Sequence, residues 1–397
     1  MIQLSERLLT MEESATIAMS RKSRELKAAG KDVISLSLGE PDFHTPDFIK
    51  QAAVEGMEQN YTTYTPVPGY DDLREAICEK FKRDNGLKYT KDQIVVSTGA
   101  KQSIANVVLS LINPGDEVLI PAPYWVSYVE IVKVAGGIPV IVSADIHSNF
   151  KITGKQLAPH LNEKVKMIIF SSPCNPTGSV YNKEELKDLA SVISKHKHIT
   201  VISDEIYEHI NFVGKHESLA QFEEVYDQVV TINGMSKAWA MTGWRLGYIG
   251  APKAIADACS KIQGQFTSGT SSITQRASIP ALKKDPAFLN DMLAAFKSRR
   301  ALVLKALQEM DGVIVNEPEG AFYFFPDISS FFGKSFNGTT INNANDMSLY
   351  LLEEALVALV TGEAFGDPNC IRISYATDEK TLTEAMRRIA EALKKLN

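Results

Sequence analysis

Short runs of β-branched and aliphatic residues alternate along much of the chain with stretches in which apolar side chains recur every three or four positions. The clearest unit is the run 94–97, which meets Gly99 and precedes a helical pattern closed by Asn113-Pro114-Gly115. Strands that alternate with helices predict an α/β fold with a mostly parallel sheet covered on both faces. The strands are expected at 33–37, 94–97, 117–121, 138–142, 167–172, 200–204, 229–232 and 246–249, and the helices at 101–111, 124–135, 183–195 and 253–262.

The pattern changes after about residue 286. A long helical pattern runs to about residue 310, strand candidates lie at 321–325 and 371–375, and a helix is expected at 348–354. The terminal stretch 379–396 places its Leu, Met, Ile and Ala residues on one helical face. These elements predict a second, smaller α+β unit.

Composition narrows the class of protein. The length of 397 residues suggests two or three domains, and 44% hydrophobic with 23% charged residues is typical of a globular protein. Lys and Arg number 42 against 48 Asp and Glu, so the net charge is −6 and nucleic acid is not an expected partner. Four dispersed cysteines favour a reducing compartment. The chain start lacks a signal-peptide pattern and no long apolar run follows, so we expect a cytoplasmic protein without a membrane segment.

Chemically useful side chains come directly after several predicted strands, at the edge where open parallel sheets bind ligands. They are Asn175, Asp204, Tyr207, Ser236 and Lys237, together with Gly99, Ala100 and Lys101 at a helix start. Taken singly, each has an ordinary explanation, such as a turn for Asn-Pro-Thr-Gly or a solvated surface position for a lysine. Together, an Asp, an Asn, a Tyr and a Lys beside an anion site at a helix start are what a pyridine aldehyde phosphate cofactor requires.

Seven segments, in order and spacing, resemble those of the class I pyridoxal-phosphate aminotransferases of the aspartate aminotransferase type. They are Ser37-Leu38-Gly39-Glu40-Pro41-Asp42, Tyr64 with Gly69, Pro123-Tyr124-Trp125, Asn175-Pro176-Thr177-Gly178, Ser203-Asp204-Glu205-Ile206-Tyr207, Ser236-Lys237 with Gly243-Trp244-Arg245-Leu246-Gly247, and Arg372. The resemblance covers nearly the whole chain and implies the fold-type I architecture of pyridoxal-phosphate-dependent transferases. It also implies a large cofactor domain at 46–285 and a small domain assembled from 1–45 and 286–397.

The resemblance assigns the central chemistry to four residues. Lys237 would form a Schiff base with the aldehyde of pyridoxal 5′-phosphate, and its freed amine would carry a proton between the substrate α-carbon and the cofactor carbon. Because this needs a neutral amine, we expect desolvation and nearby positive charge to lower the pKa of Lys237. Asp204 would keep the ring nitrogen protonated, since a pyridinium accepts electrons better than a neutral pyridine. Asn175 and Tyr207 would hydrogen-bond the phenolic oxygen of the ring.

The resemblance also implies where the ring, the phosphate and the substrate bind. Trp125, expected early in a helix, would stack on the ring and, with Asn175, border the substrate. Arg372 would bind the substrate α-carboxylate through two parallel hydrogen bonds, whereas the alternation of 371–374 alone also suits a solvent-exposed arginine. Gly39 would let the backbone approach the same carboxylate closely. The phosphate would be held by the backbone N–H groups of Gly99, Ala100 and Lys101, the Ser236 hydroxyl and the Arg245 guanidinium.

A second chain is also implied. Tyr64 matches a residue that reaches the cofactor phosphate of the neighbouring subunit in this family, and the Ser/Thr-rich run 267–272 is expected to act in the same way. The resemblance therefore implies a homodimer with shared active sites.

Substrate choice depends on the groups that meet the substrate side chain. In the bacterial subgroup that this chain resembles, a lysine of the phosphate turn and a Ser and a Thr of the N-terminal segment receive the distal carboxylate of aspartate or glutamate. Lys101, Ser14 and Thr16 match these positions. Glu12-Glu13 stand where related sequences often carry a basic residue, which argues against prephenate. We expect ping-pong transfer of the amino group of L-aspartate to 2-oxoglutarate, with the N-terminal segment and the small domain closing over a dicarboxylate.

Other activities stay open at this point. Aromatic, alanine or glutamate–prephenate transamination would use the same machinery, and a β-lyase acting on cysteine conjugates would share the scaffold. A non-enzymatic cofactor-binding regulator related to this family would carry a DNA-binding domain ahead of the aminotransferase part, whereas the family pattern here begins by Ser14. No metal site is expected, because the seven histidines show no ligand spacing.

Overall fold

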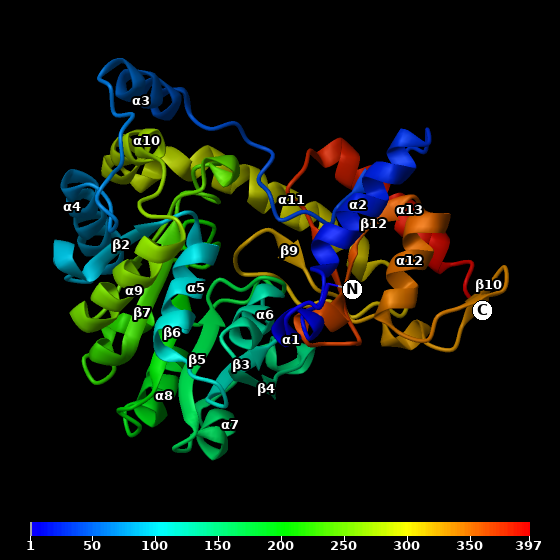
Figure 1. Ribbon diagram of the computed structural model, residues 1–397. Helices are drawn as coiled ribbons and strands as arrows, with labels where there is room; N and C mark the ends of the chain where they lie inside the picture. Colours follow the sequence, from blue (N-terminus) through cyan, green and yellow to red (C-terminus); the bar gives the residue numbers. More distant parts are fainter. Residues whose placement is uncertain (1) are drawn as a thin grey trace.

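The computed structural model describes residues 2–397, and its centre is a seven-stranded sheet (Figure 1). The strand order is β2, β8, β7, β6, β5, β3, β4, and all neighbours run parallel except that β8 is antiparallel to β2 and β7. The strands are β2 (Ile94–Ser97), β3 (Glu117–Ala122), β4 (Ile138–Ser143), β5 (Val165–Ser171), β6 (Thr200–Asp204), β7 (Val229–Gly234) and β8 (Gly247–Gly250). The predicted, mostly parallel sheet is confirmed.

Two layers of helices cover the sheet because successive side chains of a strand point to opposite faces. In β5, Met167 and Ile169 pack toward one layer, and Ile168 and Phe170 pack toward the other. The first layer contains α5 (Ala100–Leu111), α6 (Ser127–Val134) and α9 (Lys253–Phe266). The second contains α4 (Asp71–Lys80), α8 (Lys183–Ile193) with the short α7 (Gly154–Leu157), and α10 (Ser272–Lys283) with α3 (Asp47–Glu58) packed on it.

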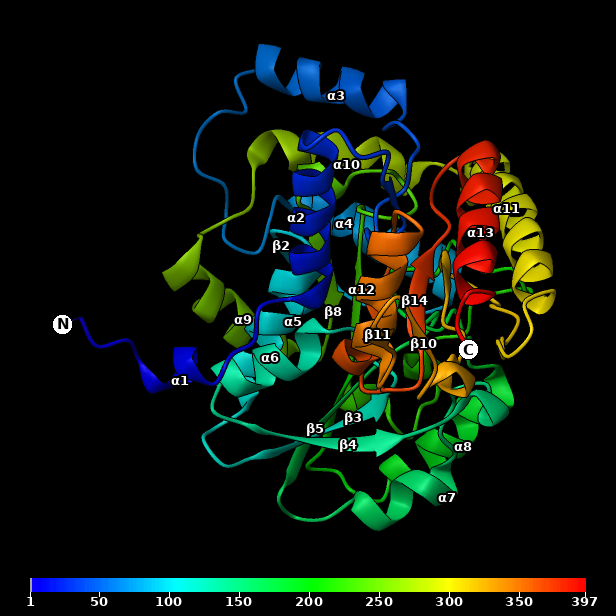
Figure 2. The same ribbon diagram turned by 90° about the vertical axis from the view of Figure 1, so that its right-hand side faces the viewer.

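Both ends of the chain meet in a second group of elements, on the right in Figure 1. β1 (Ile34–Ser35) pairs in parallel with β12 (Val357–Ala358), and β14 (Ile371–Ser374) lies between β13 (Val360–Thr361) and β9 (Tyr323–Phe324). α11 packs against α13, as Figure 2 shows. The remaining elements are α1 (Glu6–Leu9), α2 (Ala15–Ala28), α11 (Asn290–Gln308), β10 (Ser335–Phe336), β11 (Thr339–Thr340), α12 (Ala344–Glu354) and α13 (Glu379–Leu393).

Most predicted elements are confirmed, with ends displaced by a few residues. The apolar face of the terminal helix is buried in α13 through Leu382, Met386 and Ile389. The helix expected at 124–135 begins only at Ser127, because the Tyr124 N–H donates to the Phe365 carbonyl (3.0 Å) and holds this stretch as a loop. Trp125 therefore precedes the helix, contrary to the prediction.

The division into a large domain at 46–285 and a small domain from residues 1–45 and 286–397 stays a prediction. Among residues 2–397, no helix combines the length and the apolar character that crossing a membrane requires.

Candidate active site

A cavity of about 360 Å³ lies at the carboxyl ends of the central strands, next to the elements formed by the chain ends. This is the edge at which α/β sheets of this kind bind ligands. It is lined by the predicted residues Ser14, Thr16, Gly39, Ala100, Lys101, Trp125, Asn175, Asp204, Tyr207, Ser236, Lys237, Arg245 and Arg372. The structure thus gathers residues that are up to 358 positions apart, from Ser14 to Arg372, around one space.

Asp204 ends β6 and is only 4% exposed. Its Oδ2 accepts a hydrogen bond from the Tyr128 hydroxyl (2.7 Å), and its Oδ1 accepts one from the Ile206 N–H (3.2 Å). Burial raises the pKa of Asp204 to about 6, while these two donors act in the opposite direction. The carboxylate is therefore held in a fixed orientation by neutral donors, and its negative charge is available to a cationic partner in the cavity.

Lys237 comes three residues after the end of β7 and places its Nζ 2.6 Å from the Gly39 carbonyl oxygen. Burial in the cavity, together with the Arg372 charge, lowers the pKa of Lys237 to about 8. About a tenth of an amine with this pKa is neutral at pH 7, far more than for an ordinary lysine, which is a property suited to a nucleophile or base. The predicted direction of the pKa change and both of its predicted causes are confirmed.

Arg372 lies in β14 and is 2% exposed, so the alternative of a solvent-exposed arginine is wrong. Its Nη1 donates to Asn175 Oδ1 (3.0 Å) and its Nη2 donates to the Ser37 carbonyl (2.5 Å). The buried Nε has no partner within residues 2–397. A planar guanidinium with this remaining capacity is suited to a carboxylate.

The start of α5 forms a cradle for an anion. Gly99 has φ +86°, and a Cβ there would lie 2.4 Å from Arg245 Nη2, so the guanidinium sits directly against this turn. A Cβ on Gly247 would lie 2.2 Å from the Ala100 nitrogen. The close backbone packing leaves the first amides of a twelve-residue helix beside Arg245 and Ser236, an arrangement suited to phosphate.

Two tyrosines complete the site and were not among the predicted residues. Tyr128 supports Asp204, and the Tyr323 hydroxyl lies 2.7 Å from that of Tyr207. A Cβ on Gly39 would lie 2.2 Å from the Tyr323 oxygen, so only glycine fits there. Tyr128 could have been found, because it lies three residues after Trp125 in the helix predicted at 124–135, whereas Tyr323 is brought in from a distant strand.

The residues expected at the substrate side chain also line the cavity. Lys101 Nζ is 4.8 Å from the centre of the Trp125 ring, and burial together with the Arg245 charge lowers the pKa of Lys101. Thr16 Oγ1 is 3.5 Å from Arg372 Nη2, and Ser14 also lines the cavity. Tyr64 is not brought to this cavity: it is 97% exposed and borders a separate depression with residues 269–272.

The fold and the site combine an α/β sheet with a buried lysine of lowered pKa, a buried carboxylate and a helix start beside Arg245 on one cavity. Comparison with known proteins identifies the class of the protein. The family model for class I and II aminotransferases matches residues 31–389. The chain belongs to this family and has its fold-type I architecture.

Individual relatives agree with this assignment. A bifunctional aspartate aminotransferase and glutamate/aspartate-prephenate aminotransferase from Petunia hybrida is 48% identical over 99% of this chain and 83% of its own. An aspartate/prephenate aminotransferase from Cereibacter sphaeroides is also 48% identical, over 97% of each chain. Among solved structures, the aspartate aminotransferase from Rhizobium meliloti matches with TM-score 0.97 and 40% identity over the whole of both chains. The Thermus thermophilus aspartate aminotransferase with maleate matches with TM-score 0.93 and 38% identity over 99% of this chain and 100% of its own.

Proposed function

We propose that this protein is a pyridoxal 5′-phosphate-dependent aminotransferase that moves the amino group of L-aspartate to 2-oxoglutarate by a ping-pong mechanism, giving oxaloacetate and L-glutamate. The observation that carries the proposal is the convergence of Lys237, Asp204, Arg372 and the α5 anion cradle on one cavity. The 2-oxo acid acceptor is chosen because it presents the same two carboxylates as the donor.

The residues fit this cofactor in each of its three functional parts. An aldehyde needs an amine with a lowered pKa, which Lys237 offers. A pyridine nitrogen needs an acidic partner, and Asp204 is a buried carboxylate whose own hydrogen-bond donors are neutral. A phosphate needs several donors, which the α5 start, Ser236 and Arg245 supply.

When bound, pyridoxal 5′-phosphate would supply an aldehyde for the substrate amine and an aromatic ring that takes up the electron pair left at the substrate α-carbon. Arg372 and Asn175 would hold the substrate α-carboxylate and fix the α-carbon within reach of Lys237. The Lys237 amine would take the proton from the substrate α-carbon and pass it to the cofactor carbon. Asp204 would keep the ring nitrogen protonated, and Tyr207 and Asn175 would donate to the phenolic oxygen.

Aspartate is the proposed donor because the cavity carries groups for a second carboxylate. Lys101 supplies the charge, and Ser14 and Thr16 supply hydroxyls. Two relatives are named for aspartate transamination, and the Thermus structure holds maleate, a dicarboxylate. We infer that residues 14–16 and the elements of the chain ends close over such a substrate.

A homodimer with shared active sites is part of the proposal. Tyr64 is 97% exposed and borders a depression together with residues 269–272 of the Ser/Thr-rich run 267–272. Tyr64 is therefore free to contact a second copy of the chain. A separate inference concerns localisation. All four cysteines lie within the described residues and are free thiols, so we infer a cytoplasmic enzyme.

The test is a half-reaction screen of the purified protein. We expect a yellow protein whose visible absorbance shifts on adding L-aspartate and is restored by 2-oxoglutarate. The Lys237→Ala variant should lose the original absorbance. A colourless wild-type protein, or one whose absorbance ignores every amino acid, would contradict the proposal.

Prephenate transamination is the second candidate, because two relatives carry prephenate in their names. The acidic stretch Glu12-Glu13 opposes it: the Glu12 N–H donates to Glu130 Oε2 (3.1 Å), which brings a third carboxylate to the same place. We therefore expect prephenate to be a poor acceptor in the same screen. Pyruvate and ammonia formed without any acceptor would point instead to a β-lyase.

A further inference from the structure

The segment that ends β6 carries functional residues on one side and buried carboxylates on the other. Asp204 and Tyr207 line the cavity, whereas Glu205 and Glu208, each the next residue in the chain, point away from it. Both glutamates are almost completely buried, at 1% and 5% exposure. The transamination proposed above gives no role to these two carboxylates.

Glu205 is held by three side-chain donors. Its Oε1 accepts hydrogen bonds from the Ser203 hydroxyl (2.9 Å) and the Ser218 hydroxyl (2.7 Å), and its Oε2 lies 2.9 Å from His216 Nε2. The Glu205 N–H donates to the Ile232 carbonyl of β7 (2.9 Å). The backbone directly after Asp204 is therefore fixed at both its amide and its side chain.

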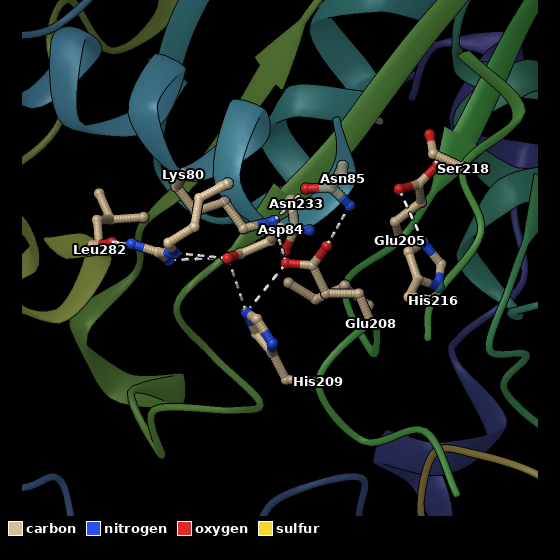
Figure 3. Close-up of polar contacts among 12 residues, drawn as sticks. Lys80, Asp84, Asn85, Glu205, Glu208, His209, His216, Ser218, Asn233 and Leu282 are labelled. Carbon is tan, nitrogen blue, oxygen red and sulfur yellow. Dashed lines mark hydrogen bonds and ion pairs between the residues drawn. The ribbon is translucent and has the colours of Figure 1, made fainter. Parts of the chain in front are cut away.

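Glu208 is held by one cation and one amide from other elements and by the neighbouring His209. It forms an ion pair with the buried Lys80 of α4, accepts from Asn85 Nδ2 (2.8 Å) and lies 3.1 Å from His209 Nε2 (Figure 3). The Glu208 N–H also donates to the Glu205 carbonyl (2.9 Å), which joins the two anchors through one turn of backbone. Tyr207 sits inside this turn.

The charges in this cluster nearly balance without any ion. Three carboxylates, Asp84, Glu205 and Glu208, face the fixed cations Lys80 and Arg83, with Arg83 bonded to both Asp84 oxygens (2.6 and 2.9 Å). Burial lowers the pKa of the His216 imidazole, but the neighbouring Glu205 outweighs this effect and raises the pKa above its usual value, which favours the charged form. The carboxylate oxygens are already paired with basic side chains of the same chain. This pairing argues for a structural role of the cluster and not for a metal site.

We propose that Glu205 and Glu208 are positioning residues, which fix Asp204 and Tyr207 from the reverse side of the sheet, with His216 and Lys80 as their counter-charges. Neither glutamate touches the cavity. Each acts through the backbone that it shares with a residue of the proposed site. The inference rests on the proposed function in that Asp204 and Tyr207 are taken to contact the cofactor.

The experiment compares Glu205→Gln and Glu208→Gln with wild type, and Leu307→Ala in α11 serves as a control that loses buried contacts far along the chain from this segment. Hydrogen exchange of the 204–208 amides in the cofactor-free protein should quicken in both glutamate variants and not in the control. Pyridoxal 5′-phosphate should bind roughly ten- to hundredfold more weakly to both variants. Their kcat should fall while the KM for the amino acid changes little.

A charge-balanced variant separates positioning from simple destabilisation. Lys80→Met combined with Glu208→Gln leaves no unpaired buried charge but also lacks the anchor, so it should recover most of the stability lost in Glu208→Gln while its affinity for pyridoxal 5′-phosphate stays low. It also keeps the test available if Glu208→Gln does not fold. The proposal is overturned if both glutamate variants only lower the melting temperature, as Leu307→Ala does, with wild-type exchange at 204–208 and wild-type affinity. A wild-type protein without visible absorbance would reject the proposed function instead, and the exchange measurement would still decide this inference.

Discussion

At the scale of single residues, the ionisation state of the Asp204 carboxyl group depends on one neighbouring hydroxyl group. The Tyr128 hydroxyl donates to its carboxylate and so favours the ionised form. Hydrogen bonds to charged groups contribute about 1.5–3 kcal/mol, which corresponds to about one to two pH units. Tyr128→Phe should therefore raise the pKa of Asp204 further and move the acid limb of the kcat/KM profile to higher pH, with activity unchanged at alkaline pH.

The matched control for this change is Tyr181→Phe. The Tyr181 hydroxyl is also buried, and it accepts a hydrogen bond from the Ile152 N–H (2.9 Å), away from Asp204. This control should leave the acid limb in place. An identical pH profile for wild type and Tyr128→Phe would contradict the role given to this hydroxyl.

Asp204 also links stability to pH in the cofactor-free protein. Its pKa is raised from 3.8 to about 6, so between these values the unfolded chain is ionised at this residue while the folded protein is not. Ionisation then favours the unfolded state, and the free energy of unfolding falls as pH rises from 4 to 6, by about 3 kcal/mol from this residue. The Asp204→Asn variant should lack this component. Denaturant unfolding of both proteins from pH 4 to 7 measures it, and parallel curves would count against the raised pKa.

Arg372 provides a test of carboxylate recognition. Lysine cannot offer two parallel N–H donors and leaves Asn175 and the Ser37 carbonyl without their partner. Arg372→Lys should lower kcat/KM for aspartate roughly a hundredfold, mostly through KM. Arg299→Lys is the control: Arg299 also makes two hydrogen bonds to one carboxylate, that of Asp42 (2.7 and 2.9 Å), but does not line the cavity. Equal losses in the two variants would show that the effect is one of stability alone.

The sequence predicted those cavity residues that lie at, or a few residues after, the carboxyl end of a strand. Asn175, Asp204 and Lys237 belong to this group, because the carboxyl ends of parallel strands meet at one edge. Arg372 was correctly placed only by family resemblance, since β alternation suits an exposed arginine equally well. Tyr323 was missed, because no local pattern shows that β9 packs beside Tyr207.

At the scale of elements, the anion cradle depends on how closely β8 approaches α5. A Cβ on Gly247 would meet the Ala100 nitrogen at 2.2 Å, which is backbone and cannot turn aside. Gly247→Ala should therefore displace the start of α5, lower stability by about 1–3 kcal/mol and weaken phosphate binding. Gly243→Ala is the control, because nothing lies within 4 Å of a Cβ there. Cofactor affinity and thermal unfolding measure both, and normal affinity in Gly247→Ala would contradict the cradle.

The sequence predicted the bounds of elements that have a strong local pattern. It did not predict the bounds of elements that depend on contacts with distant parts of the chain. The run 94–97 became β2 with the predicted bounds. The strand expected at 33–37 is reduced to β1 (Ile34–Ser35), because its partner β12 is itself only two residues long. Trp125 lies outside the helix predicted at 124–135, because the neighbouring Tyr124 N–H donates a hydrogen bond to the carbonyl of Phe365, more than two hundred residues away in the sequence.

At the scale of the whole molecule, overall and local charge have opposite signs. The chain carries a net charge of −6, yet the cavity gathers four basic residues. They are Lys101, Lys237, Arg245 and Arg372. A cationic cavity in an acidic protein attracts small dianions and repels polyanions from the surface, which agrees with a phosphate cofactor and dicarboxylate substrates.

The proposed homodimer can be tested by mixing two defective chains. If Tyr64 acts on the partner's site, a hybrid of a Lys237→Ala chain and a Tyr64→Ala chain contains one site with both residues intact. Random exchange of the two chains should then give about a quarter of all sites with wild-type cofactor affinity, although neither parent dimer has any. If Tyr64 instead served its own chain, no hybrid site would be intact, and mixing would recover nothing. Cofactor titration before and after mixing by partial unfolding and refolding distinguishes the two cases, with two wild-type samples treated in the same way as the control.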